Sequence, residues 1–392
     1  MKKVVFIALA LILVIGITPL MACGGEEGET EEYKIGAVLA LSGHGSSLGE
    51  PEKQTLEMLE DELNAAGGID GKNIKVIIYD TESDSSTAII ATKRLIEQDN
   101  VLAVMGATTS GVSMAMLDTI TDAEVPLVSL AASDEIIQPV EQRYWIFKTP
   151  QTNSQVVGRL YQYLESQDID EIAIISATDG FGVLGHGALV SETENWDITI
   201  VADETFDPDD TDMTTQLTVI KGFEPEAVIC WGTDKGSSVV AKNMQTLQMD
   251  MPLLMSHGIA SMDFIDSAGD AANGVIFPVG KLPVADLLPD NDPQKDVLLA
   301  YKADFEDLYG EGSADTFGGH AWDAFMLITD AIQDLVDEGA DVTSAGIRDK
   351  LETAQLTGIS GVFHMSATDH LGLGPDALTL VEIVDGEWTS GE

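Results

Sequence analysis

The sequence predicts an α/β protein built from two Rossmann-like lobes, each a mostly parallel sheet between layers of helices, joined by three hinge crossings. Three observations favour this fold class. Short apolar segments alternate with helical periodicity from residue 33 to residue 130, the same alternation then starts again, and the last third is helical with almost no strands. Two neighbouring parallel strands need a crossover connection, which is usually a helix. Helices that have no strands beside them in the sequence are expected to pack on a sheet formed by earlier strands.

The first α/β unit precedes residue 150. Short apolar runs there are typical of buried strands, and Leu56, Leu59 and Leu63 recur on one helix face. We expect strands at 33–41, 74–79, 101–105 and 126–130, and helices at 52–66, 86–97 and 112–123.

The second unit repeats this pattern, and its join to the first lies near 147–153. We expect strands at 171–176, 198–202, 227–231, 252–255 and 274–277, and helices at 156–166, 187–196, 214–222 and 237–248. Two successive units of similar size indicate two lobes, which is also what the length allows.

The last third contains the remaining helices and a terminal hairpin. We expect helices at 294–309, 317–338 and 345–354, a strand at 379–384, and turns at 369–374 and 385–386. The chain must then cross back between lobes near 278–284 and again within 358–378. The predicted lobes are 33–150 plus 282–360 and 151–281 plus 361–392.

The N-terminus predicts export and a lipid anchor. Lys2 and Lys3 precede an apolar run at 4–17, which fits a signal peptide over 1–22 better than a membrane span, the alternative interpretation. Leu20–Met21–Ala22–Cys23 resembles a bacterial lipobox, so Cys23 is the predicted lipidation site. Residues 23–32 contain no large apolar side chain and read as an acidic tether.

Composition excludes several classes of function. A net charge of −48 argues against binding nucleic acid or anionic membrane surfaces, whereas 44% hydrophobic residues still supply a full core. The only other cysteine, Cys230, lies in an apolar strand, so neither a disulfide nor a cysteine-based zinc site is expected. We expect no metal, no cofactor and a monomer.

The candidate site follows two neighbouring strands of the first unit. Thr108, Thr109 and Ser110 come after one strand, and the 131–133 turn, Ala131–Ala132–Ser133, comes after the next. Ligands of open parallel sheets bind at such strand ends, and unpaired amides at a helix N-terminus favour an anion. Ordinary helix capping by these hydroxyls is the alternative.

Several segments resemble the branched-chain amino acid-binding family of type I periplasmic proteins. They are Leu39–Gly43 with Gly49, the stretch Asn64–Ala65–Ala66–Gly67–Gly68–Ile69–Asp70–Gly71, Tyr79–Thr81, Ser129–Ser133 and Phe147–Thr149. The resemblance covers nearly the whole chain after the tether. It implies a Venus-flytrap fold that closes around a ligand and delivers it to an ABC transporter permease.

The same resemblance implies particular site residues. The turns at 108–110 and 131–133 would hold a ligand carboxylate, and the second lobe would contribute Phe181 and a residue near Asp234. The acid that pairs with the ammonium of an amino acid is expected within 255–258, where His257 stands, and Leu48 replaces a usual tyrosine. Unless Asp234 supplies the charge for the ammonium, a larger apolar or aromatic acid, lined by Leu48, Phe181 and Trp231, competes with an amino acid as ligand. For His257, a buried structural role is the alternative to ligand contact.

Other functions are disfavoured. Gly43–Gly49 has the spacing G-x-G-x-x-x-G, one residue too long for a dinucleotide-binding turn. Residues 207–212 resemble the start of a calcium loop, but the sixth position is not Gly and the twelfth is Thr218 rather than Glu. No nucleophile and base are placed together, so we expect a binding protein and no enzyme. A lipid-anchored sensor that signals to a receptor is the alternative to an importer component.

Overall fold

The computed structural model describes residues 32–391, and the predicted signal peptide and Cys23 lie outside these residues. Their first sheet is parallel and has the strand order β2-β1-β3-β4-β5. Each strand ends at the same edge, because every connection crosses over through a helix or loop. The strands are β1 (Glu32–Leu39), β2 (Asn73–Asp80), β3 (Ala103–Gly106), β4 (Leu127–Ser129) and β5 (Ile146–Lys148).

The second sheet has the order β14-β13-β10-β9-β8-β6-β7. Its five strands from β10 to β7 are parallel, and the terminal hairpin β13–β14 adds antiparallel strands at one edge. The strands are β6 (Glu171–Ala177), β7 (Thr199–Phe206), β8 (Ala227–Trp231), β9 (Leu253–Met255), β10 (Ile276–Val279), β13 (Thr379–Val384) and β14 (Glu387–Ser390).

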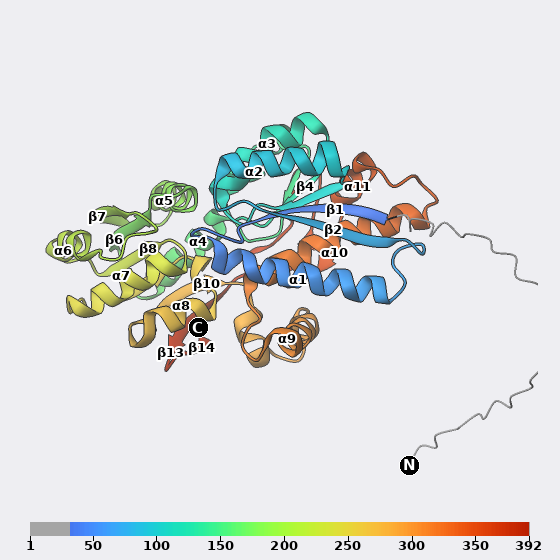
Figure 1. The fold of residues 1–392 in the computed structure, drawn as a ribbon. Coiled ribbons are helices and arrows are strands. Elements are labelled where there is room, and N and C mark those ends of the chain that lie inside the picture. Colours follow the sequence, from blue (N-terminus) through green and yellow to red (C-terminus); the bar gives the residue numbers. More distant parts are fainter. Residues whose placement is uncertain (1–31, 392) are drawn as a thin grey trace, which may run out of the picture. The chain divides into compact units, whose positions relative to one another are not determined.

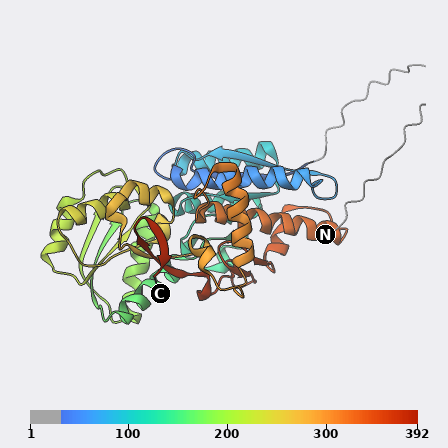
Figure 2. The ribbon, with the colours of Figure 1, turned by 90° about the horizontal axis from the view of Figure 1, so that it is seen from below.

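Helices flank both sheets (Figures 1 and 2). Those packed with the first sheet are α1 (Ser46–Ala65), α2 (Ser85–Arg94), α3 (Ser110–Ala123), α9 (Lys295–Tyr309), α10 (Thr316–Asp337) and α11 (Ser344–Leu351). Those of the second sheet are α4 (Asn153–Ser166), α5 (Gly180–Glu192), α6 (Thr214–Gly222), α7 (Asp234–Thr246) and α8 (Met262–Ala268). The helices without strands of their own, α9 to α11, complete the first sheet as the sequence predicts.

The chain passes between the sheets three times. It leaves the first sheet after β5, returns after β10 to α9 and α10, and leaves again to form β13. The exact lobe boundaries stay a prediction. The segment 361–392 is assigned from the sequence to the second lobe. Its residues Phe363, Leu371 and Ala377 nevertheless pack in the core of the first sheet, and Leu378 is the first residue of the segment that packs in a core of the second sheet.

Several elements differ from the sequence predictions. The α5 helix begins at Gly180 rather than 187, because the Asp179 carboxylate caps it by accepting the Gly182 N–H at 2.8 Å. Strand β5, helix α8 and the small hairpin β11 (Gln355–Thr357) to β12 (Val362–His364) were not predicted. Each is only three to seven residues long, too short for periodicity to reveal.

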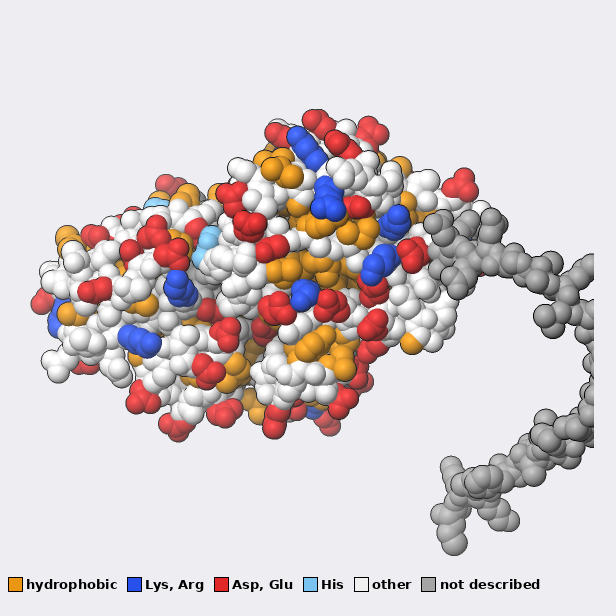
Figure 3. All heavy atoms as spheres, in the orientation of Figure 1, with side chains coloured by type: hydrophobic (Ala, Val, Ile, Leu, Met, Phe, Trp, Pro, Cys, Tyr) orange, Lys and Arg blue, Asp and Glu red, His pale blue; other side chains and the backbone are white. Residues whose placement is uncertain are grey.

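The surface view shows acidic side chains spread over the visible face with far fewer basic ones (Figure 3). None of the helices within 32–391 combines the length and the apolar character that crossing a bilayer requires.

Candidate functional site

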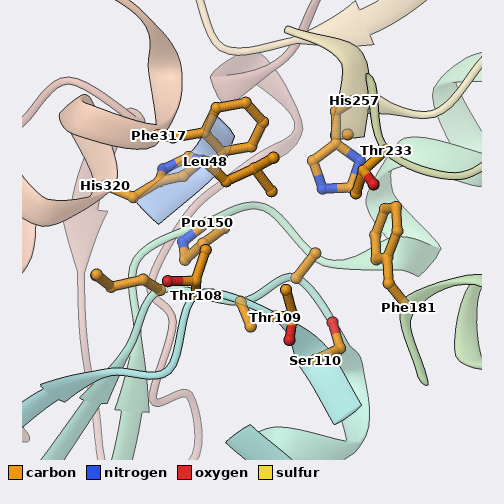
Figure 4. Close-up of a pocket in the computed structure, with 14 residues that line it drawn as sticks. Leu48, Thr108, Thr109, Ser110, Pro150, Phe181, Thr233, His257, Phe317 and His320 are labelled. Carbon is orange, nitrogen blue, oxygen red and sulfur yellow. The ribbon is translucent and has the colours of Figure 1, made fainter. Parts of the chain in front are cut away.

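A small cavity lies where the carboxyl ends of β3 and β4 face loops of the second sheet, and the empty space in and around its mouth amounts to about 370 Å³. The first side contributes Leu48, Thr108, Thr109, Ser110, Leu130, Ala131, Ala132, Pro150, Phe317 and His320, and the second side contributes Phe181, Thr233, His257 and Gly258. Figure 4 shows His257 and Phe181 facing the turn of Thr108 to Ser110 across this space.

The N-terminus of α3 opens into the cavity. Thr109 is the N-cap residue, has extended backbone, and makes no capping hydrogen bond with its side chain. The first amides of α3 therefore keep their hydrogen-bonding capacity and the positive end of the helix dipole. An anion in the cavity would meet backbone donors without having to displace a capping side chain.

The two threonines of this turn have different roles. The Thr108 hydroxyl accepts the Ala40 N–H at 2.9 Å and donates to the Glu52 carboxyl at 2.5 Å, so it is already engaged within the protein. Within residues 32–391 the Thr109 hydroxyl has no hydrogen-bond partner, although its side chain lines the cavity. Of the three hydroxyls of this turn, those of Thr109 and Ser110 are therefore the ones with a proton not already donated within the described residues.

The second turn is partly engaged as well. The Ala131 N–H donates to the Ser129 hydroxyl at 3.2 Å, and the Ser133 N–H donates to the Ser110 hydroxyl at 3.3 Å. Ser133 is fully buried, donates its hydroxyl to Glu135, and does not line the cavity. The expectation of free amides at Ala131 and Ser133 is thus wrong, because neighbouring serines satisfy both. The Ser110 hydroxyl keeps its proton for a ligand.

Two predicted residues of the second side lie behind the cavity wall. Trp231 is fully buried, and its ring centroid is 5.8 Å from that of Phe181 and 6.2 Å from that of His257. It supports the two side chains that line the cavity. Asp234 accepts hydrogen bonds from Ser47 and Ser261, each at 3.0 Å, and does not line the cavity either.

Contacts between the two sides hold the cavity closed. Ser47 belongs to α1, so its hydrogen bond to Asp234 on α7 joins the two sides. The His44 Nε2 lies 3.6 Å from the Asp179 carboxylate. Helices α3 and α5 touch at Gly111 and Gly180, which leave no space between them for a side chain.

The charge state of the cavity follows from burial. Desolvation lowers the pKa of His257 and of His320 to about 3, so both imidazoles are neutral at pH 7. Beneath Ala132, the Lys148 ammonium donates to the Ala132 carbonyl, and burial lowers its pKa to about 7. The His257 Nδ1 is buried without a partner among the described residues, whereas the His320 Nδ1 lies 2.8 Å from the Ser360 hydroxyl.

Six residues that line the cavity were not predicted from the sequence as site residues: Leu130, Pro150, Thr233, Gly258, Phe317 and His320. Phe317 and His320 come from α10, some 200 residues from the predicted turns, and no local motif signals them. Within residues 32–391 no group of three or more His, Cys, Asp or Glu side chains is placed to hold a metal. The arrangement provides anion donors at one end, apolar walls and neutral imidazoles, which suits binding.

Comparisons with known proteins agree with the fold described above. The profile of the family described as periplasmic binding protein matches residues 32–387. The Leu/Ile/Val-binding protein BraC3 of Rhizobium johnstonii is 22% identical over 269 residues, 69% of this chain and 72% of that protein. A crystal structure of an extracellular ligand-binding receptor from Rhodopseudomonas palustris HaA2 is 25% identical with a TM-score of 0.85, covering 92% of this chain and 100% of that one.

A further solved structure contains a ligand. It is the branched-chain amino acid transporter substrate binding protein LivJ from Streptococcus pneumoniae in complex with isoleucine. It is 25% identical to this chain, with a TM-score of 0.78 over 92% of this chain and 98% of that one.

Proposed function

This chain belongs to the periplasmic binding protein family, and from that premise we propose that it is the lipid-anchored binding component of an ABC-type importer, which captures a small carboxylate between its lobes. Membership confirms the predicted family and fold class, and the family consists of solute-binding proteins and not of enzymes. The anchor at Cys23, the delivery to a permease and the carboxylate ligand are parts of the proposal.

The observation that carries the proposal is the uncapped N-terminus of α3 inside a cavity lined from both sides. A carboxylate there would accept hydrogen bonds from the first amides of α3 and from the Ser110 and Thr109 hydroxyls. The names of the Rhizobium relative and of the isoleucine complex support a small carboxylate, because both describe amino acid binding.

Capture depends on closure. The Ser47–Asp234 hydrogen bond, the His44–Asp179 pair and the Gly111–Gly180 contact all join the two sides without touching the cavity interior. In the proposed mechanism, an open form exposes the α3 turn, a ligand bridges the two sides, and its contacts with Phe181 and His257 favour the closed form. The permease then recognises the closed shape.

The direct test is Ser110→Ala in isothermal titration against a panel of small carboxylates. Loss of this hydroxyl removes one hydrogen bond to the anion and should weaken binding by ~1–3 kcal/mol. Ser191→Ala, on the exposed side of α5, is the matched control and should bind as the unmodified protein does. Equal affinity of Ser110→Ala and the control would refute the site.

The importer role has its own tests. Deleting the gene should abolish uptake of the identified ligand, and Cys23→Ala should abolish incorporation of labelled lipid. Unchanged uptake together with a lost ligand response would favour the sensor alternative.

A further inference from the structure

The cavity lining contains no acidic side chain. Its polar members are three hydroxyl residues on α3 or the turn before it, Thr233, and the two histidines. An α-amino acid brings both a carboxylate and an ammonium group, and burying an ammonium without an acceptor of opposite charge is costly. The donors at the α3 turn serve only the carboxylate end.

Three buried acids of the surrounding elements accept hydrogen bonds outside the cavity, although Glu52 Oε1 and Asp234 Oδ1 have no partner among the described residues. Asp234 accepts from Ser47 and Ser261, and Glu52 accepts from Thr108. Asp315 accepts the Gly318 N–H at 2.9 Å as the N-cap of α10. None of the three lines the cavity, and burial raises the pKa of each. The lining therefore offers a ligand no carboxylate side chain.

The other polar groups around the cavity do not favour the ammonium group of a ligand either. The Lys148 Nζ donates to the Ala132 carbonyl, and the protonated fraction of this amine adds positive charge behind the cavity wall. His257 and His320 face the same space from opposite sides, and their rings can accept or donate hydrogen bonds as neutral groups. The walls between these polar ends are Leu48, Leu130, Phe181 and Phe317.

Resting on the proposed capture of a small carboxylate, we propose that the ligand is a carboxylic acid with an apolar or aromatic body and no ammonium group. Its carboxylate meets the turn of Thr109 and Ser110, its body lies between Phe181 and Phe317, and a neutral hydroxyl or carbonyl at its far end is received by His257, whose Nδ1 has no partner among residues 32–391 (Figure 4).

Two ligand pairs that differ only by the α-ammonium group test this. The pairs are 4-methylpentanoate with leucine and 3-phenylpropanoate with phenylalanine, titrated calorimetrically into the purified chain. We expect at least one deaminated acid to bind about 100-fold or more tightly than its amino acid, as an unpaired buried ammonium requires. Amino acids that bind equally or more tightly would overturn this inference and leave carboxylate capture standing. Binding of no member of either pair would overturn both.

A designed acid provides the second test. Thr233 lines the cavity and is the N-cap of α7 with extended backbone, a position that suits Asp and Asn equally. Thr233→Asp should improve the affinity for the amino acid relative to its deaminated partner by about 10-fold or more, whereas isosteric Thr233→Asn should leave the ratio unchanged. Equal ratios in the two variants would contradict the proposed cause of the preference. If Asp234 served an ammonium, Asp234→Asn would abolish binding of the amino acid but not of its deaminated partner, and that outcome would also overturn the inference.

Discussion

Closure of the two sides depends on a contact between two glycines, which makes Gly180→Ala an informative perturbation. A Cβ at Gly180 would lie 2.8 Å from the Gly111 nitrogen and closer still to its Cα, whereas ordinary contacts begin at 3.4 Å. The obstructing atoms are backbone, which cannot turn aside as a flexible side chain would. Helices α3 and α5 must therefore separate before the methyl group fits.

The magnitude follows from this overlap. Overpacking of one methyl group costs ~1–3 kcal/mol, and here the cost falls on the closed form alone, because the contact joins the two sides. Ligand affinity should therefore drop by about 5- to 150-fold. Thermal stability of the ligand-free chain should not fall, since an open form relieves the clash and alanine suits a helix better than glycine.

Titration calorimetry and thermal unfolding of the same samples separate the two effects. Gly187→Ala is the control, because it lies in the same helix α5 and a Cβ there meets nothing within 4 Å. It should bind ligand as tightly as the unmodified chain. Closure through the Gly111–Gly180 contact is refuted if Gly180→Ala binds as tightly as Gly187→Ala, or if its thermal stability falls without any loss of affinity.

Three further predictions concern buried polar groups. Thr108→Val should lower the free energy of unfolding by ~1–3 kcal/mol in urea titrations, because the Ala40 N–H and the Glu52 carboxyl both lose their partner; an effect on ligand affinity alone would contradict this assignment. Burial raises the pKa of Asp234 from 3.8 to about 7, so the folded chain binds this proton more tightly than the unfolded chain does. The contribution of Asp234 to the free energy of unfolding therefore declines as pH rises from ~4 to ~7. Asp234→Asn should flatten that decline in denaturation curves measured across this range. Binding of an anion should raise the lowered pKa of Lys148, so the chain should take up protons when it binds ligand near pH 7 to 8. A binding enthalpy that does not depend on the ionisation enthalpy of the buffer would refute this proton uptake.

Local patterns in the sequence predict much of this protein's architecture. Apolar runs and leucine spacing predict the long helices and most strands, since burial of one face imposes its period on the residues themselves. The order of those elements then predicts two sheets and three passages between them. It also predicts that the turns after β3 and β4 lie at one sheet edge, and Thr109, Ser110 and Ala131 do line the cavity.

Tertiary packing decides which polar groups remain available there. The sequence offers Thr108, Ala131 and Ser133 as donors, but Glu52, Ser129 and Ser110 already engage them. These hydrogen-bond partners are set by tertiary packing, so the local sequence pattern does not predict them.

Tertiary packing also decides which α10 side chains line the cavity and which groups bind the Asp234 carboxylate. His320 and Phe317 enter from α10 because the chain returns to complete the first sheet, and Asp234 turns toward Ser47 only because α1 and α7 meet across the closed interface. Periodicity is a property of neighbouring residues, so the sequence determines the elements and their strand ends. Which side chains face the ligand is a property of three-dimensional contact, and only the folded chain decides it.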